Sequence, residues 1–412
     1  MTAPERELID DCVRCGFCLP HCPTYVSWGE EMDSPRGRID LMRQVRGGAP
    51  LTPTIAAHFD RCLGCMACVT ACPSGVRYDI LIEETRAQVE REHRRPLRER
   101  IKRAMIFSLF PYPRRLKAAV ALLLAATWTG LRWLLEKLHL FPSLAPRVTA
   151  HHLGASLPER VPAQAPQRHR VALVAGCVQR VFFPSVNEAT LRVLAAEGCE
   201  VIVPRGQGCC GALSMHAGRD QESLRFAREL MEIIGAAQVD AVLINAAGCG
   251  SHLKDYGRLL GTEAARAFSA RVRDVNEFLA ALSPRAKRNP LALRIAMHDA
   301  CHLQHAQRIF AQPRALLRGI PGVELLEIPE GNQCCGSAGI YNLTQPESAD
   351  QIGARKVDNV LSTGADLIAS ANPGCTLQME KFLRARGRTL PAAHPIEILD
   401  ASISGTPAPW SR

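Results

Sequence analysis

The second half of the chain alternates short apolar runs with longer amphipathic stretches. Six apolar runs occur in two groups of three, at residues 171–176, 200–204 and 241–246 and at residues 294–300, 324–329 and 365–371. Runs of this length between helical stretches are typical of strands in parallel α/β units. We therefore expect two repeated α/β domains with parallel sheets, at residues 166–288 and 289–412.

Two helix-start signals stand out in this pattern. Ser34 followed by Pro35 is typical of an N-cap and first helical position, and helical spacing continues from there towards Gly47. In the second half, Ser185 and Glu188 form the S-x-x-E pattern of a capping box. We expect a helix to start at each of these two serines.

Residues 91–165 are predicted to form a basic and apolar helical linker region. From Arg86 to Lys117 the chain has eleven Lys or Arg and three Glu, and residues 118–131 then carry no charge. A spanning helix needs about twenty apolar residues, so this shorter segment favours a buried or interfacial helix. Trp128 and Trp133 make residues 86–135 a candidate for peripheral contact with the inner face of the cell membrane, with a solvated helix face as the alternative.

Cysteine is the unusual component of the composition. The 412-residue chain has 17 cysteines and a formal net charge of +10. Its N-terminus lacks the apolar segment and cleavage site of a secretory signal, so we expect a cytoplasmic protein whose reduced thiols bind metal. The basic segment has no nucleic-acid recognition motif, so no nucleic-acid partner is expected.

Two cysteine runs near the N-terminus share the spacing C-x2-C-x2-C-x3-C-P. This is the bacterial ferredoxin spacing, in which the fourth cysteine ligates the other cluster. A zinc interpretation would leave the third and fourth cysteines and both prolines unexplained. Residues 1–90 are therefore predicted to form a mostly helical domain with two [4Fe-4S] clusters. The predicted ligands are Cys12, Cys15, Cys18 and Cys72 for the first cluster and Cys62, Cys65, Cys68 and Cys22 for the second.

Each α/β repeat carries four cysteines in nearly the same register. Their spacings are 32, 1 and 39 residues in the first repeat and 33, 1 and 40 in the second. The cysteines follow predicted strands, and ligands bind beyond the carboxyl ends of parallel strands. These thiols are candidate ligands of additional metal sites: Cys177, Cys209, Cys210 and Cys249, and Cys301, Cys334, Cys335 and Cys375. Cys199 is left over and is expected to be a small buried apolar residue.

The glycines around the first cysteine pair also match a dinucleotide-binding fingerprint. Gly206, Gly208 and Gly211 satisfy G-x-G-x-x-G, but they follow a later strand than the fingerprint requires. The equivalent segment at residues 331–339 keeps Cys-Cys-Gly and loses the glycine pattern. We therefore expect no flavin or nicotinamide site on this chain.

Two ferredoxin runs followed by two Cys-Cys-Gly repeats resemble the glycolate oxidase iron-sulfur subunits. Subunits of anaerobic glycerol-3-phosphate dehydrogenase and heterodisulfide reductase are related, and the resemblance covers nearly the whole chain. It is carried by DSPRGRIDLM (33–42), CPSGVRY (72–78), GCVQ (176–179), GCGSHLKDYG (248–257), CHLQHAQ (301–307) and CCGSAGIYNLTQPE (334–347).

The resemblance implies electron transfer, with no catalytic residue and no substrate site on this chain. Flavin-binding glycolate oxidase subunits would oxidise glycolate to glyoxylate, and this subunit would pass the electrons to a quinone or another acceptor. The alternatives are a heterodisulfide reductase-type catalytic subunit, or an iron-sulfur subunit for lactate or glycerol-3-phosphate oxidation.

The Cys-Cys-Gly repeats depart from the related reductases, whose motif ends in C-x-x-C. Here His252 and Gln378 stand where the last cysteines would be. His252 is a candidate replacement ligand, and spacing does not single out one of His298, His302 and His305 as a cofactor contact. A further iron-sulfur cluster, a zinc ion and paired thiols remain the alternatives for these repeats.

Overall fold

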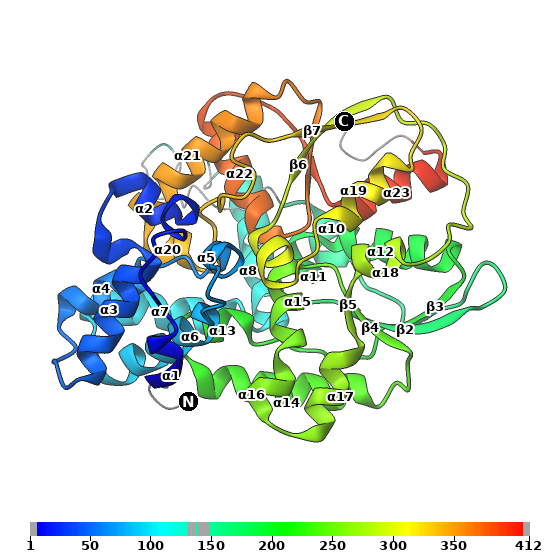
Figure 1. Cartoon of the computed structure of the whole chain (residues 1–412). Helices are drawn as coiled ribbons and strands as arrows, with labels where there is room; N and C mark the ends of the chain where they lie inside the picture. Colours follow the sequence, from blue (N-terminus) through cyan, green and yellow to red (C-terminus); the bar gives the residue numbers. More distant parts are fainter. Residues whose placement is uncertain (1–5, 131–132, 134–136, 138–147, 407–412) are drawn as a thin grey trace.

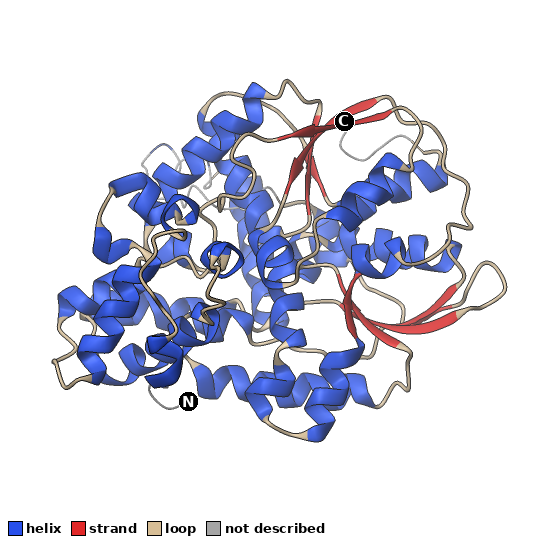
Figure 2. Cartoon of the chain, viewed as in Figure 1, coloured by secondary structure: helices blue, strands red, loops and turns tan. Residues whose placement is uncertain are grey.

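The computed structural model describes residues 6–130, 133, 137 and 148–406. A group of short N-terminal helices lies beside two parallel sheets (Figure 1), and helices dominate the chain (Figure 2). The expected α+β organisation, with a mostly helical N-terminal part, is confirmed. The N-terminal elements are α1 (Arg6–Asp10), η1 (Leu19–His21), α2 (Pro23–Trp28), η2 (Glu31–Asp33), α3 (Pro35–Arg46), α4 (Pro53–Asp60), α5 (Ala67–Ala71) and α6 (Tyr78–Glu92).

One of the two predicted helix starts is confirmed. The Ser34 hydroxyl accepts a hydrogen bond from the Gly37 amide (3.0 Å) and caps α3. The capping box predicted at Ser185 is wrong, because α12 (Pro184–Ala196) already begins at Pro184, which is preorganised for the first helical position. Glu188 instead contacts the His151 ring (3.1 Å).

The two repeats form two sheets with one common strand order. All six predicted strands are present, and each sheet places its second strand next to its first, followed by the third and a short fourth strand. The short strand β1 adds an antiparallel edge to the first sheet, which the hydrophobic pattern did not predict. The first sheet contains β1 (Arg160–Val161), β2 (His169–Val174), β3 (Cys199–Ile202), β4 (Ala241–Ile244) and β5 (Val272–Asp274); the second contains β6 (Leu293–His298), β7 (Val323–Glu327), β8 (Leu367–Ser370) and β9 (Ala392–Ala393).

The sheets share one apolar core. Val171 and Leu173 of β2 face the same buried cluster as Ile295 and Met297 of β6, which also holds the fully buried Cys199. The helices between the sheets (Figure 1) are α12, α18 (Val275–Ala280), α19 (Ala311–Arg318) and α23 (Pro395–Ser404). The outer faces are covered by α14 (Asp220–Gly235), α15 (Ala247–Lys254), α16 (Tyr256–Leu260) and α17 (Glu263–Arg271) on one side and by η3 (His302–Ala306), α21 (Pro346–Ser362) and α22 (Pro373–Ala385) on the other.

The described part of the linker region is mostly helical, and it packs partly on the first repeat. Leu116, Val120 and Leu124 of α8 (Pro113–Trp128) are buried against Val181 of α11 (Val178–Phe182). Within the described residues, none of the helices is long and apolar enough to cross a membrane. The end of the predicted interfacial segment, from residue 131, lies outside the described residues apart from Trp133. The remaining helices are α7 (Leu97–Leu109), α10 (Ala150–Gly154), α13 (Ala212–His216) and α20 (Tyr341–Thr344).

The backbone of the first repeat touches α6 very closely at Gly218. This glycine has φ +78°, and a Cβ there would lie 2.2 Å from the Arg86 carbonyl oxygen. The next residue back, Ala217, accepts a hydrogen bond from Arg103 (2.8 Å). The glycine therefore allows the N-terminal helices to approach the first repeat.

We expect Gly218→Ala to lower the free energy of unfolding because its methyl group cannot fit against α6. Gly387→Ala is the matched control, since Gly387 also has a positive φ (+63°) and a Cβ there meets nothing within 4 Å. The contact should make Gly218→Ala about 1–3 kcal/mol more destabilising than the control. Anaerobic urea unfolding followed by circular dichroism measures the difference, and equal losses would show that the close approach is unimportant.

Candidate metal centres

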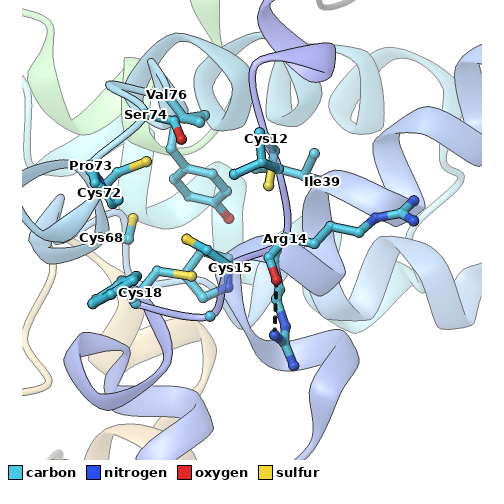
Figure 3. Close-up of a pocket in the computed structure, with 16 residues that line it drawn as sticks. Cys12, Arg14, Cys15, Cys18, Ile39, Cys68, Cys72, Pro73, Ser74 and Val76 are labelled. Atoms are coloured by element: carbon cyan, nitrogen blue, oxygen red, sulfur yellow. Dashed lines mark hydrogen bonds between the residues drawn. The ribbon is translucent and has the colours of Figure 1, made fainter.

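The structure brings the first predicted set of cysteines around one space. Cys12, Cys15 and Cys18 come from the loop after α1, and Cys72 follows α5. Their sulfur atoms point into a common space together with that of Cys68 (Figure 3). Cys68 was predicted to belong to the second set of ligands, so it lies at the boundary between the first and second sets.

The loop that carries this first set lies at the surface. Gly16 has φ +87°, and Arg36 donates a hydrogen bond to the Arg14 carbonyl (3.3 Å). Two large apolar side chains of the loop point outward, Val13 (68% exposed) and Phe17 (63%). The first set of thiols is therefore close to solvent and to any protein that docks on this loop.

The second set is buried. Cys62 and Cys65 lie on the loop between α4 and α5, Cys68 lies in the first turn of α5, and Cys22 comes from the first cysteine run. Burial is the main reason that the pKa of Cys65 and Cys68 is raised. The charges of neighbouring thiolates, which include Cys22 and Cys62, raise it further. The crossover predicted from the spacing thus places Cys22 among the thiols of the second run.

Cys62 is surrounded by groups that favour its thiolate. It accepts hydrogen bonds from the Gly64 amide (3.3 Å) and the Tyr78 hydroxyl (3.6 Å). Burial alone would raise the pKa of Cys62, but the guanidinium groups of Arg38 and Arg86 outweigh it and lower the pKa. A deprotonated sulfur is the form that binds iron.

Arg38 is the centre of a buried network beside the second set. It is 1% exposed and donates to the His58 carbonyl (2.7 Å) and the Thr24 hydroxyl (3.2 Å). It also forms an ion pair with Asp33 (3.2 Å). Sequence reasoning gave Arg38 no role because a charged residue on a helix is normally exposed.

The sulfur-rich donor set suits iron-sulfur chemistry. Iron-sulfur clusters take thiolate ligands, and backbone amides and hydroxyls that donate to the sulfurs tune them. Among the described residues, the three side chains that converge as for a single metal ion lie in the second repeat and not in the ferredoxin runs. The eight N-terminal thiols therefore fit clusters better than single ions.

The four cysteines of the first repeat form a row of thiols. The Cys177 and Cys209 sulfurs are 3.5 Å apart, Cys210 follows directly, and the Cys210 sulfur contacts that of Cys249. Phe226 packs against the first two of these thiols. This arrangement confirms that the three loops converge, and it leaves open whether a metal binds there.

The second repeat brings its cysteines together next to the N-terminal domain. Cys334 and Cys65 belong to one buried cluster, against which Cys301 packs. Cys335 and Cys375 lie deeper, under the carboxyl edge of the second sheet. The row of thiols in this repeat therefore begins at the loop of the second ferredoxin run.

The structure separates the candidate histidines. His302 bonds the Gly64 carbonyl (3.0 Å), and His305 bonds the Thr70 hydroxyl (2.8 Å), so both face the ferredoxin loop. The Nε2 atom of His252 bonds the Ser223 hydroxyl (3.0 Å), which does not support His252 as a replacement ligand. His298 alone joins Cys335 and Cys375 in a compact group.

Gln378, the other residue in place of a cysteine, has a structural role. Its side chain donates to the Ala349 carbonyl (3.2 Å) and accepts from the Asn342 amide (3.0 Å). It is completely buried. Gln378, which stands where the related reductases have a fifth cysteine, therefore holds α22 against α20 and α21.

A cavity of about 510 Å³ opens between the second ferredoxin run and the repeats. Thr70 and Cys72 line one wall, and His216, His252 and His302 line another. Burial lowers the pKa of His252 to about 3 and that of His302 to about 4, so both rings are neutral near pH 7. The cavity is large enough for a small redox-active molecule and lies directly beside the second ferredoxin run.

Three family models match parts of this chain. Residues 8–76 match a 4Fe-4S dicluster domain, and residues 171–254 and 295–380 each match a cysteine-rich domain. Residues 98–155 match the linker region of the glycolate oxidase iron-sulfur subunit. The matches cover the N-terminal cysteine runs, the helical linker and both repeats.

Two relatives are similar over most of the chain, and a third is similar over about half of it. The probable glycolate oxidase iron-sulfur subunit of Bacillus subtilis is 37% identical over 93% of this chain and 90% of that protein. The glycolate oxidase iron-sulfur subunit of Escherichia coli is 37% identical over 95% of this chain and 93% of that protein. Lactate utilization protein A of an Exiguobacterium species is 26% identical over 57% of this chain and 98% of that protein.

One solved structure has a similar fold. It is a hypothetical protein from Helicobacter pylori, with a TM-score of 0.50 and 11% sequence identity. The similarity covers 90% of this chain and 73% of that protein. At this identity the likeness concerns the fold alone.

We expect Tyr78→Phe to make one of the cluster reduction potentials more negative without loss of iron. The hydroxyl donates to the Cys62 sulfur, and such a bond stabilises the extra negative charge of a reduced centre. Tyr341→Phe is the control, because its hydroxyl donates to the Arg61 carbonyl (3.0 Å) and not to a sulfur. Potentiometric titration followed by electron paramagnetic resonance measures both variants, and equal shifts would exclude a specific effect of the bond.

Proposed function

This chain belongs to the family of glycolate oxidase iron-sulfur subunits and is an iron-sulfur electron-transfer subunit, and we propose that it takes electrons from a flavoprotein that oxidises glycolate to glyoxylate. The observation that carries the proposal is the gathering of eight N-terminal thiols into an exposed set and a buried set. One set can meet a partner protein while the other faces the interior of this chain.

We assign the cluster ligands by the ferredoxin crossover. When bound, iron-sulfur clusters accept and release single electrons. The proposed ligands are Cys12, Cys15, Cys18 and Cys72 for one cluster, and Cys62, Cys65, Cys68 and Cys22 for the other. Arg38 and Arg86 would favour the thiolate form of Cys62, whose pKa they lower.

The flavoprotein partner is proposed to dock on the loop of residues 12–18. Val13 and Phe17 expose apolar surface there, and Cys15 is itself exposed. Exposed aromatic and aliphatic side chains around a redox centre suit a protein contact better than open solvent. Docking at this loop would bring the flavin side of the complex next to the first set of thiols.

Glycolate is favoured over lactate by the linker region. Residues 98–155 match the glycolate oxidase linker, whereas the lactate utilization relatives cover little more than half of this chain. A heterodisulfide reductase-type activity is less well supported, because Gln378 is committed to structural hydrogen bonds where that motif has a cysteine. The acceptor is proposed to be a quinone or similar small carrier that enters the cavity beside Thr70 and His302.

Glycolate should bleach the cluster absorbance of this chain only when the flavoprotein subunits are present. The chain has no proposed substrate site of its own, so anaerobic stopped-flow with glycolate and the isolated chain should show no reduction. Reduction by glycolate without the partner, or reduction of a heterodisulfide by the chain alone, would refute the proposed role.

A matched pair of variants tests the docking loop in the same experiment. Phe17→Glu should slow glycolate-driven reduction about tenfold or more, because a charge replaces buried apolar contact at the interface. Phe310→Glu is the control, since Phe310 is also exposed (51%) and lies at the start of α19. Dithionite should reduce both variants as fast as the unmodified chain.

The outer face of α7 is a candidate membrane contact. Leu97, Ile101 and Met105 are one helical turn apart and are 67%, 50% and 59% exposed. The exposed basic residues Arg98 and Lys102 flank this stripe. Apolar residues beside basic ones suit an anionic lipid surface, so we propose that α7 rests on the membrane and brings the chain to a lipid-soluble acceptor.

The double variant Ile101→Glu, Met105→Glu should bind vesicles of phosphatidylglycerol and phosphatidylethanolamine at least about tenfold more weakly, because each change removes buried apolar area and adds repulsion. Co-sedimentation measures the binding, with Phe310→Glu again as the control. If the unmodified chain stays in the supernatant, or if the control loses as much binding, α7 is not the contact.

A further inference from the structure

A compact group of three side chains lies at the carboxyl edge of the second sheet. His298 ends β6, Cys335 follows β7, and Cys375 lies in the first turn of α22. One ring nitrogen of His298 and the two sulfurs all lie within 4.8 Å of one another, and all three residues are buried. Three separate elements therefore deliver one nitrogen and two sulfurs to one point.

The polar atoms around this point lack partners. Apart from the thiol of Cys335 within the group itself, neither ring nitrogen of His298 has a hydrogen-bond partner, although the residue is only 2% exposed. The hydroxyls of Ser337 and Ser370 are also buried and unpartnered, and Ser370 pairs with His298 across the sheet. A buried polar group without a partner is destabilising, so several at one sheet edge indicate that this edge suits a ligand.

The first repeat provides an internal comparison. Counting from the shared cysteines, Val174, Ala212 and Ile244 occupy the positions of His298, Ser337 and Ser370. These three residues pack with Cys210 in one apolar cluster. The same place in the fold is therefore filled by hydrocarbon in the first repeat and by unpartnered polar groups in the second.

We propose that the second repeat binds one zinc-type divalent ion through His298, Cys335 and Cys375, and that the first repeat binds none. Two thiolates and an imidazole are donors that favour zinc over magnesium or calcium. Ligand atoms around tetrahedral zinc are about 3.5–3.8 Å apart, so the group needs only a small contraction. The fourth position is left for a ligand that these three residues do not supply.

The ion would fix the loop that supports the second ferredoxin run. Cys335 is adjacent to Cys334, which packs with Leu63 and Cys65 of the N-terminal domain. Holding Cys335 to β6 and α22 would therefore hold Cys334 against that domain. This role is structural and does not depend on glycolate, the flavoprotein or the acceptor.

Metal analysis of the full chain tests the proposal. Protein purified anaerobically from zinc-supplemented cells should contain about one zinc per chain in addition to its cluster iron. His298→Val should remove the zinc, and valine is chosen because Val174 packs well at the equivalent position. Cys375→Ser should also remove it, whereas its counterpart in the first repeat, Cys249→Ser, should retain it. X-ray absorption at the zinc edge should show two sulfur ligands and at least one nitrogen ligand.

Several results would overturn the site. They are zinc retained in both His298→Val and Cys375→Ser, zinc lost in Cys249→Ser, absence of zinc from the unmodified chain, or extra iron and sulfide that depend on His298. The visible absorbance of the N-terminal clusters should be unchanged in every variant, which shows that the chain is folded. Because this readout does not involve electron transfer from glycolate, the zinc site and the proposed function can fail separately.

Discussion

The burial of negatively charged thiolates is the constraint on which much of this structure depends. A thiolate removed from water needs a nearby positive charge or hydrogen-bond donors. Arg38 supplies the charge from inside the protein, and it is itself costly to bury unless it is paired. Asp33, Thr24 and the His58 carbonyl meet that need, and they tie η2, α2 and α4 to one side chain of α3. The position of α3 thus follows from the electrostatics of Cys62 and Cys22.

The second ferredoxin run is completed by residues far away in the sequence. Tyr341 donates to the Arg61 carbonyl, and His302 bonds the Gly64 carbonyl, so the second repeat satisfies the backbone on both sides of Cys62. Loops that carry metal ligands have few backbone hydrogen bonds of their own, and buried carbonyls need partners. The N-terminal part therefore has its own helices but depends on the C-terminal part for a dry and fully bonded second site.

The sequence predicts the repeated architecture well because it depends on local patterns. The six strands of 171–371 are short apolar runs between helices, and the cysteine spacing fixes which loops converge. The short strands β5 and β9 were missed, since two or three residues carry no periodic signal. Arg38 was missed, and His298 was named but not singled out, for another reason: the role of each depends on partners elsewhere in the sequence, such as Cys22 for Arg38 and Cys375 for His298. A residue-by-residue comparison of the two repeats would have singled out His298, because Val174 stands in its place.

The two repeats show how one fold can serve two purposes in one chain. Their strand order is the same, and their cysteines lie at the same sheet edges. What differs is the neighbourhood: Cys177 and Cys209 are covered by Phe226 and Tyr112, whereas Cys301 and Cys334 face the buried ferredoxin loop. A sulfur row covered by aromatic rings is insulated, and a row that begins at Cys65 shares its electrostatic environment with the second set of thiols. The position of each repeat relative to the N-terminal domain, together with the residues at its sheet edge, therefore decides what its cysteines can do.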